Sequence, residues 1–300
     1  MIRLSPRDVA LALCVPLIWG MGFVFAKAAI AHFPPIFLMA LRFAVTAAAL
    51  VFFVKPPVHA FGALFVIAFV SAAIQYSLTF NGLAGLDAST AVLVVQLEVP
   101  FLVLLGALLL GETPGWRQVL GIVVAFVGVG FIAGEPRIID AWVSVSLVAS
   151  GAFVWALGQV MLRELARRLE GKGQPPIDGF ALIAWIAMFA APQLMVFSLF
   201  FENNHAAYLA SANTVVWGTV IYLGLVMTAL GYGIWYSLIT RHPVSRVGPF
   251  LLLLPVFSVI ASVIILGEKL TVWTVAGGLL VLAGLAILSF GSKPEKAATR

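Results

Sequence analysis

Two short clusters of polar and aromatic residues lie inside otherwise apolar stretches, and they are the first candidates for chemistry. The first cluster is Gln75-Tyr76-Ser77, and the second comprises Tyr232, Trp235, Tyr236 and Ser237. Amide, phenol and hydroxyl groups surrounded by hydrocarbon need hydrogen-bond partners or water, so both clusters should face the protein interior. Such faces can bind a small molecule, or they can bind each other.

A tryptophan and a glycine recur with helical spacing in two further apolar stretches. Trp19, Gly22 and Phe23 are followed 136 residues later by Trp155, Gly158 and Gln159. Positions i, i+3 and i+4 share one face of a helix, and a tryptophan in mid-helix is far from the membrane-interface belt. These residues either form an aromatic wall of a binding cavity or pack helices together, and the sequence leaves both interpretations open.

One acidic residue, Glu98, lies in the middle of an apolar stretch. On a helix, Gln96 shares a face with Pro100, whereas Glu98 points about 200° away from Gln96. A carboxylate at this depth needs a cation or a proton, and Arg42 is the candidate cation. We expect a structural charge pair between Arg42 and Glu98, with a proton-coupling carboxylate as the functional alternative.

Motifs for catalysis or for cofactor binding are missing from the sequence. The four histidines and the single Cys14 lack metal-ligand spacing, and no G-x-S-x-G, H-E-x-x-H or Walker sequence occurs. The net charge of +5 is scattered and forms no basic patch with base-stacking aromatics. The sequence therefore predicts no enzyme, no metal, no cofactor and no nucleic-acid partner.

The composition shows which elements must position the candidates. Hydrophobic residues make up 63% of the chain and charged residues 10%, against about 25% charged residues in soluble domains. Ten apolar runs are long enough to cross a membrane as helices. They cover residues 8–31, 36–54, 60–84, 89–110, 116–134, 143–163, 178–201, 214–240, 245–266 and 272–290. The fold class predicted is an all-α membrane protein in contact with lipid.

The second half of the chain repeats the first. Residues 86–132 correspond to residues 242–288 at a shift of 156, which aligns Tyr76 with Tyr232 and Gly111-Glu112 with Gly267-Glu268. We therefore predict two five-helix repeats, residues 1–136 and residues 137–300. Because five is odd, the second repeat should enter the membrane from the opposite side, which gives inverted repeats.

Prolines and glycines occupy matched places in the two repeats. Pro100 and Pro255 each remove a backbone donor and kink a helix, so they are predicted to flex during gating. Glycines seven residues apart lie on one helix face and permit close contact. They predict that the fifth and tenth helices pack together, through Gly121, Gly128, Gly277 and Gly284.

The distribution of lysine and arginine predicts the orientation. With the N-terminus inside, 13 of the 17 basic residues lie on the inner side and 4 on the outer side or at outer helix ends. Basic residues accumulate on the cytoplasmic side of membrane proteins. Both termini are therefore predicted to be cytoplasmic.

The duplicated helix–Gly-Glu–helix unit, the Trp-x-x-Gly helices, Leu41-Arg42-Phe43 and Leu97-Glu98-Val99-Pro100 together resemble the EamA-type drug/metabolite transporter superfamily. The resemblance covers almost the whole chain, although Val99 intervenes where the family more often places proline directly after the glutamate. It implies ten helices in two inverted repeats and export of metabolites from the bacterial cytoplasm across the inner membrane. Within the superfamily the chain looks most like aromatic amino-acid exporters, which implies a pore lined by Trp19, Tyr76, Trp155 and Tyr232.

The function expected is export of small metabolites, amino acids including aromatic ones first, by alternating access around a central aromatic-lined cavity in a monomer. The alternative is a multidrug or quaternary-cation exporter, of the kind that handles methyl viologen, in which aromatic walls supply cation–π contacts. The predicted substrate-binding residues are Trp19, Gly22, Gln75, Tyr76, Gln96, Trp155, Gln159, Tyr232, Trp235 and Tyr236.

Overall fold

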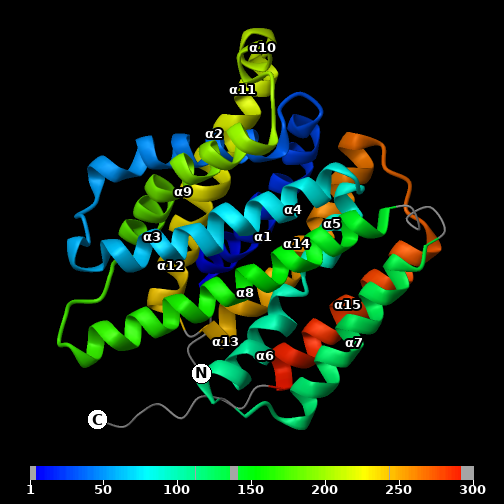
Figure 1. The fold of residues 1–300 in the computed structure, drawn as a ribbon. Coiled ribbons are helices and arrows are strands. Elements are labelled where there is room, and N and C mark those ends of the chain that lie inside the picture. The colour runs from blue at the N-terminus through cyan, green and yellow to red at the C-terminus, as the bar shows by residue number, and fades with distance from the viewer. Residues whose placement is uncertain (1–4, 112, 136–140, 243, 292–300) are drawn as a thin grey trace.

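The computed structural model describes residues 5–111, 113–135, 141–242 and 244–291, and every regular element in these ranges is helical. Ten helical spans are long and apolar enough to cross a membrane, as predicted, and we number them 1 to 10 in chain order. Figure 1 shows the α-helices of the chain, of which α10 and α13 lie outside the ten spans. These are α1 (Pro6–Ile30), α2 (Pro35–Leu50), α3 (Phe61–Ala68), α4 (Gln75–Ala84), α5 (Ala88–Val95), α6 (Glu98–Leu110), α7 (Trp116–Ala133), α8 (Trp142–Gly171), α9 (Gly179–Phe201), α10 (His205–Ser211), α11 (Thr214–Ile221), α12 (Gly231–Arg241), α13 (Val244–Val247), α14 (Leu253–Ala261) and α15 (Val272–Gly291).

Three spans contain a π-helical segment, which the sequence did not reveal. The third span passes from α3 to α4 through a π-helical segment, Phe69–Ile74, and the eighth passes from α11 to α12 through another, Tyr222–Leu230. The ninth span ends in a third π-helical segment, Ser262–Leu266. The first two segments overlap at the repeat shift of 156. A π-helical turn is often found at a functional site.

The fourth and ninth spans are broken at corresponding residues. The helix is interrupted at Gln96–Leu97 between α5 and α6, and at Leu252–Leu253 a 3₁₀ segment, Gly248–Leu252, gives way to α14. In the fourth span Pro100 cannot donate to the Gln96 carbonyl, which instead accepts a 3.3 Å bond from the Val99 amide.

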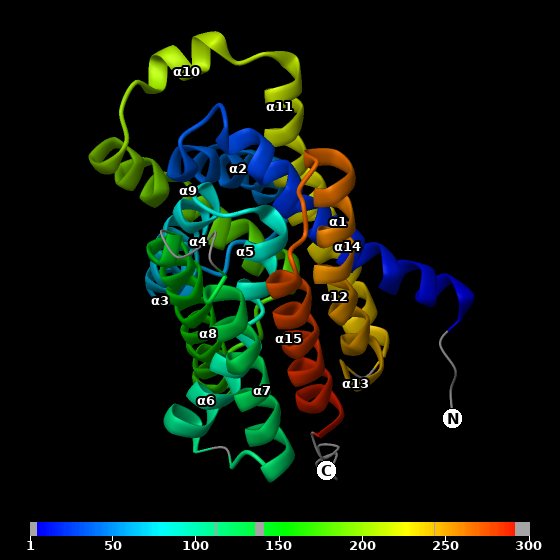
Figure 2. The same cartoon turned by 90° about the vertical axis from the view of Figure 1, so that its right-hand side faces the viewer.

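The fifth and tenth spans, α7 and α15, pack closely, as their glycine spacing predicted. A Cβ atom added to Gly128 would lie 2.7 Å from the Gly277 carbonyl, and one added to Gly121 would lie 2.7 Å from the Gly284 carbonyl. The helices therefore touch backbone to backbone, and Figure 2 shows them side by side. This contact requires glycine because any side chain would push the backbones apart.

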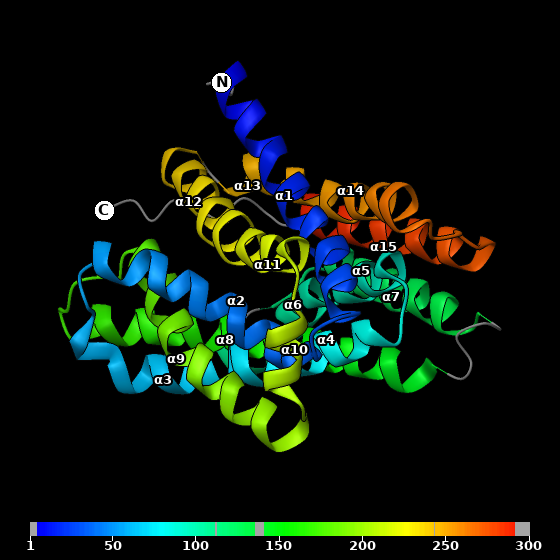
Figure 3. The same ribbon diagram turned by 90° about the horizontal axis from the view of Figure 1, so that it is seen from above.

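The helix contacts keep the same pattern when spans 1–5 are exchanged with spans 6–10. In the contacts between repeat mates, α2 packs on α9 and α7 packs on α15. The other contacts correspond between the repeats. The first span, α1, packs on α12 of the eighth span and α14 of the ninth, and its repeat mate α8 packs on α4 of the third span and α6 of the fourth. Seen from above, α1, α12 and α14 lie on one side of the molecule and α3, α8 and α9 on the other (Figure 3).

Buried apolar side chains form one large cluster and two small ones. The spans run between two ends of the bundle; we call the end at which α1 begins the N-terminal side and the opposite end the far side. The large cluster includes Phe33, Phe37, Phe80 and Leu83 on the far side and extends toward the N-terminal side through Ile122 and Leu288. On the N-terminal side the buried residues form two separate clusters: Ala12, Val15, Leu238 and Val247 on α1, α12 and α13, and Leu105, Ala156 and Val160 on α6 and α8.

Two segments depart from the predicted boundaries. The helix α8 has 30 residues, about 45 Å at 1.5 Å per residue, so it exceeds the roughly 30 Å hydrocarbon core. Its last turns carry the exposed Arg167 and Arg168 and extend into water. The loop expected around residues 202–213 contains α10, which lies on the far side beyond α9 and α11 (Figure 2).

Candidate functional site

An aromatic group joins the first and eighth spans. The Trp19 ring lies 4.9 Å from the Tyr232 ring and 6.3 Å from the Trp235 ring, measured between centroids, and Tyr232 lies 6.1 Å from Tyr236. All four side chains are half-buried. The structure therefore brings together these four of the predicted site residues.

Side chains bond to three carbonyls of the π-helical segment of the eighth span. The Trp19 indole donates to the Met227 carbonyl at 3.0 Å, the Thr46 hydroxyl to the Gly224 carbonyl at 3.0 Å, and the Thr228 hydroxyl to the Leu223 carbonyl at 2.8 Å. A backbone carbonyl without a partner is costly inside a membrane protein. These bonds therefore stabilise the unusual turn that precedes Tyr232.

Tyr76 and Tyr232, the repeat mates, occupy corresponding places in the two repeats. Each lies in the first turn after a π-helical segment, at the start of α4 and of α12. The Tyr232 hydroxyl interacts electrostatically with Tyr76, Tyr236, Arg42 and Glu98, which lie on three other helices and on α12 itself. Tyr76 itself packs on Phe43 and Phe80.

Arg42 lies behind this group and is 1% exposed. Its Nε and Nη2 donate to the Thr228 hydroxyl at 3.1 and 3.0 Å, and its Nη1 faces the Met39 sulfur at 3.9 Å. The guanidinium carbon lies 5.0 Å from the centre of the Tyr76 ring and 5.5 Å from that of Phe43. Cation–π contacts of this kind stabilise a desolvated cation.

The ion pair expected between Arg42 and Glu98 is not formed in the structure. In the described ranges, no carboxylate oxygen lies within 4.0 Å of an Arg42 nitrogen. The guanidinium is held by the threonine and the aromatic rings instead. The prediction failed because it considered charge and depth alone, without the hydroxyl and ring partners that the second and eighth spans supply.

Glu98 opens α6 directly after the break in the fourth span. Its side chain is partly accessible, and it forms no hydrogen bond or ion pair with any part of the chain that the structure describes. Because it interacts electrostatically with Tyr232 on another span, its carboxylate faces the bundle interior and not lipid. Gln96 precedes it at the break, also partly accessible and without a partner among the described residues.

The other predicted site residues lie at helix contacts. Gly22 packs against the Met227 side chain, and Gly158 packs against Ser71. Gln75 is 4% exposed and donates to Thr79 at 3.0 Å, while its carbonyl oxygen has no partner. Trp155 packs on α6 within the Leu105 cluster, separate from the Trp19 group, and Gln159 follows one turn later, half-buried.

The predicted kink prolines both lie buried just after the breaks of their spans. Pro100 is the third residue of α6 and Pro255 is the third residue of α14. Their role in gating stays a prediction.

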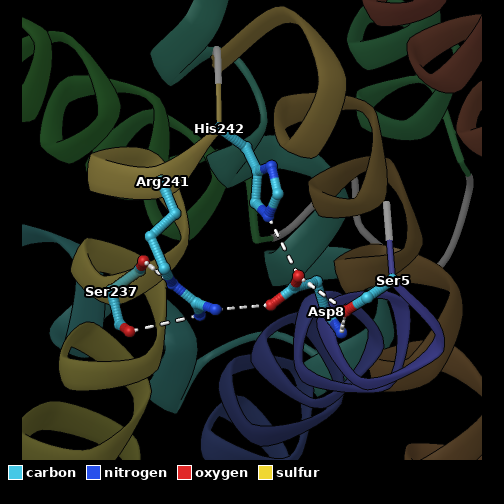
Figure 4. A network of polar contacts seen from close by, with 5 residues as sticks. All are labelled: Ser5, Asp8, Ser237, Arg241 and His242. Atoms are coloured by element: carbon cyan, nitrogen blue, oxygen red, sulfur yellow. Dashed lines mark hydrogen bonds and ion pairs between the residues drawn. The ribbon is translucent and has the colours of Figure 1, made fainter. Parts of the chain in front are cut away.

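A polar network that sequence reasoning missed joins α1 to α12 on the N-terminal side (Figure 4). Asp8 pairs with Arg241 at 2.7 Å and with His242 at 3.1 Å, and accepts a 2.7 Å bond from the Ser5 hydroxyl. Asp8 is the one acidic residue in the first turn of α1, so a search for partners of isolated acids at span ends would have singled it out.

A pocket of about 260 Å³ lies on the far side, where the ends of several spans meet. Its polar lining includes Lys27, Asp87, Glu135, Lys269 and Thr274. Lys27 donates to the Leu83 and Ala84 carbonyls at 3.0 Å each, and Thr274 donates to Glu135 at 3.1 Å. These bonds fix the span ends.

The neighbouring Glu268 caps the start of α5. Its carboxylate accepts bonds from the Ala88 amide at 2.6 Å, the Ser89 amide at 3.0 Å and the Ser89 hydroxyl at 2.6 Å. Gly267 precedes it with φ of 68°, and its repeat mate Gly111 has φ of 69°. The Gly-Glu motif therefore combines a left-handed turn with a cap; its other copy, Glu112, lies outside the described residues.

Comparison with known proteins shows which family shares this architecture. The family model described as "EamA-like transporter family" matches residues 7–134 and again residues 142–290. A "Probable amino-acid metabolite efflux pump" of Salmonella typhimurium strain LT2 is 31% identical over 98% of this chain and 99% of its own length. A protein of the same description from Escherichia coli strain K12 is 31% identical over 98% of each chain.

Two further similarities are less close. A "Probable terminal-alkyne amino-acid exporter" of Streptantibioticus cattleyicolor is 29% identical over 71% of this chain and 68% of its own length. A protein of known crystal structure aligns with a TM-score of 0.65 over 98% of this chain and 99% of that one. At 18% identity this alignment supports the fold alone.

Proposed function

This chain belongs to the EamA-like transporter family, and we propose that it exports amino acids or closely related metabolites by alternating access around Tyr76 and Tyr232. The observation that carries the proposal is the matched placement of these two tyrosines, each directly after a π-helical segment. Trp19 lies beside Tyr232, the Arg42 guanidinium lies beside Tyr76, and Glu98 interacts electrostatically with Tyr232. Such a group matches a small molecule that is partly apolar and carries both charges.

Alternating access follows from the two-fold character of the helix contacts. The exchange of spans 1–5 with spans 6–10 preserves the contact pattern, and the odd number of spans in each half makes the repeats inverted. The breaks at Gln96–Leu97 and at Leu252–Leu253 coincide in the repeats. They give both halves the same weak point, at which α6 and α14 can swing.

We infer a state that is open on the N-terminal side. There, small separate clusters of buried residues pack α1, α12 and α13 together and α6 and α8 together. With 13 of 17 basic residues predicted on the inner side, that side is the cytoplasm of a bacterial inner-membrane protein. The conformation would then receive substrate from the cytoplasm, as an exporter must.

The substrate class follows from the relatives and from the lining. Three relatives carry names that refer to amino acids or their metabolites. The lining combines Trp19, Trp235 and the two tyrosines with very few fixed charges, which suits apolar and aromatic amino acids better than multiply charged anions.

A cation exporter is the second candidate, because Glu98 faces aromatic rings that could hold a quaternary ammonium by cation–π contacts. The buried Arg42 opposes it. Since like charges repel strongly in a poorly screened interior, a permanent cation would lose affinity there.

Transport into liposomes tests the proposal. Purified protein in vesicles should carry labelled phenylalanine or leucine with a saturable rate, and a Tyr232→Ala variant should lose most of it. The exposed pair of α8 supplies a control, since Glu164→Gln should leave the rate unchanged. Linear, unsaturable flux would indicate a channel, and uptake of methyl viologen without amino acids would favour the cation exporter.

A further inference from the structure

Arg42 is a buried cation without a counter-anion in the described part of the chain. A single hydroxyl, a sulfur and two aromatic faces are its contacts, and its Nη1 has no oxygen acceptor among the described residues. A desolvated charge is costly unless an opposite charge compensates it. The interior next to Tyr76 therefore has a positive potential that an anionic group would relieve.

Glu98 is the complementary case. It has no partner in the described ranges, yet it faces the interior and remains partly accessible. A carboxylate at this depth is stabilised by a cation, and Arg42 does not supply that cation in the structure. The surroundings of Tyr232 therefore carry a negative charge from Glu98 on the fourth span and a positive charge from Arg42 on the second span.

Two tyrosine hydroxyls near these charges have spare hydrogen-bonding capacity. The Tyr76 and Tyr232 hydroxyls have no hydrogen bond to the described residues, and both side chains are half-buried. Tyr232 interacts electrostatically with Arg42 and with Glu98. A phenol can donate to a carboxylate and so extend the reach of a guanidinium that lies one layer behind it.

We propose that Glu98 binds the α-ammonium group of the substrate, and that Arg42, acting through the Tyr76 and Tyr232 hydroxyls, positions its α-carboxylate. Arg42 is thus a positioning residue, and Glu98 a binding residue. The ligand class is the free α-amino acid, with both charges, in preference to an amine or an N-acylated acid. This inference rests on the proposed function and narrows its substrate.

Competition binding tests it on the full-length protein in detergent. Tritiated phenylalanine and leucine are displaced by the parent compound, by the matching amine, which lacks the carboxylate, and by the N-acetyl derivative, which lacks the ammonium. In the wild type each analogue that lacks a charged group should displace the label at least about ten-fold more weakly than the parent, because a buried charge of the protein then stays unpaired. We call the loss of affinity of each analogue relative to the parent amino acid its penalty. In Glu98→Gln the penalty of the N-acetyl derivative should fall to less than about three-fold, while the penalty of the amine persists.

The arginine is tested by a pair of variants. Arg42→Met should abolish the amine penalty alone, and Arg42→Lys should restore it because the positive charge returns. Glu164→Gln, a matched change at an exposed carboxylate, should alter neither penalty. If Arg42→Met fails to fold, the Glu98→Gln ratios alone decide the matter.

The outcomes separate this inference from the proposed function. It is overturned if neither amino acid binds, if the charge-deleted analogues bind as tightly as the parents, or if Glu98→Gln weakens all three ligands equally, as a purely structural residue would. Charge-selective binding without transport into liposomes would leave the inference standing and refute the exporter.

Discussion

The Trp19 indole on α1 and the Met227 carbonyl on the eighth span share a 3.0 Å hydrogen bond. The carbonyl belongs to the π-helical segment Tyr222–Leu230. One side chain thus contributes a ring to the aromatic group and also satisfies the backbone turn that places Tyr232. The wall of the site and its support therefore cannot be altered independently.

Replacing Trp19 by phenylalanine removes this bond and keeps a ring. Loss of this hydrogen bond costs about 1 kcal/mol, so the melting temperature in detergent should fall by about 2–4 °C. Trp235→Phe is the matched control for stability, since the Trp235 indole has no bond to the described residues. Equal melting temperatures for both variants would show that the Trp19 bond is dispensable.

The contact between α7 and α15 should tolerate no side chain at its crossing points. In Gly128→Ala the new Cβ would meet the Gly277 carbonyl and the Val281 amide, both at 2.7 Å. Overpacking of this kind costs about 1–3 kcal/mol, measurable as loss of thermal stability. In Gly130→Ala nothing lies within 4 Å of the new atom, so stability should hold or rise. A destabilised Gly130→Ala variant would mean that helix flexibility, and not the close contact, explains the glycines.

The Glu268 cap predicts that replacing glutamate by glutamine lowers stability at Glu268 much more than at the exposed Glu164. Glutamine at this position keeps one acceptor and places an amide donor against either the Ala88 or the Ser89 amide. Loss of such a cap costs about 1 kcal/mol, so Glu268→Gln should lower the melting temperature. The same substitution at Glu164, in an exposed i,i+4 pair, should change it by less than a third as much.

The sequence predicted what depends on composition and repetition. Ten apolar spans and the pairing of α7 with α15 follow from patterns that persist over many residues. The Arg42–Glu98 pair failed because a guanidinium can satisfy itself with a hydroxyl and aromatic rings from a distant span. The sequence did not reveal the π-helical segments because α-helical and π-helical turns in a membrane span have the same apolar composition. Side chains that bond to a π-helical segment, such as Thr46 and Thr228, distinguish the two kinds of turn.

Cysteine labelling can determine which side of the molecule is open. Cys14 is exposed, so a Cys14→Ser background is needed first. Gln159 on α8 lies on the N-terminal side and is half-buried, whereas Thr79 on α4 lies in the closed far half and is 1% exposed. In inside-out vesicles a membrane-impermeant maleimide should modify Gln159→Cys rapidly and leave Thr79→Cys unmodified.

The same probe applied to right-side-out vesicles should modify neither cysteine while no substrate is present. Added amino acid should slow the modification of Gln159→Cys as the population shifts away from the inward-open state. Modification of Gln159→Cys from the outside alone would reverse the assigned orientation. Equal modification from both sides would mean a continuous pore, which alternating access forbids.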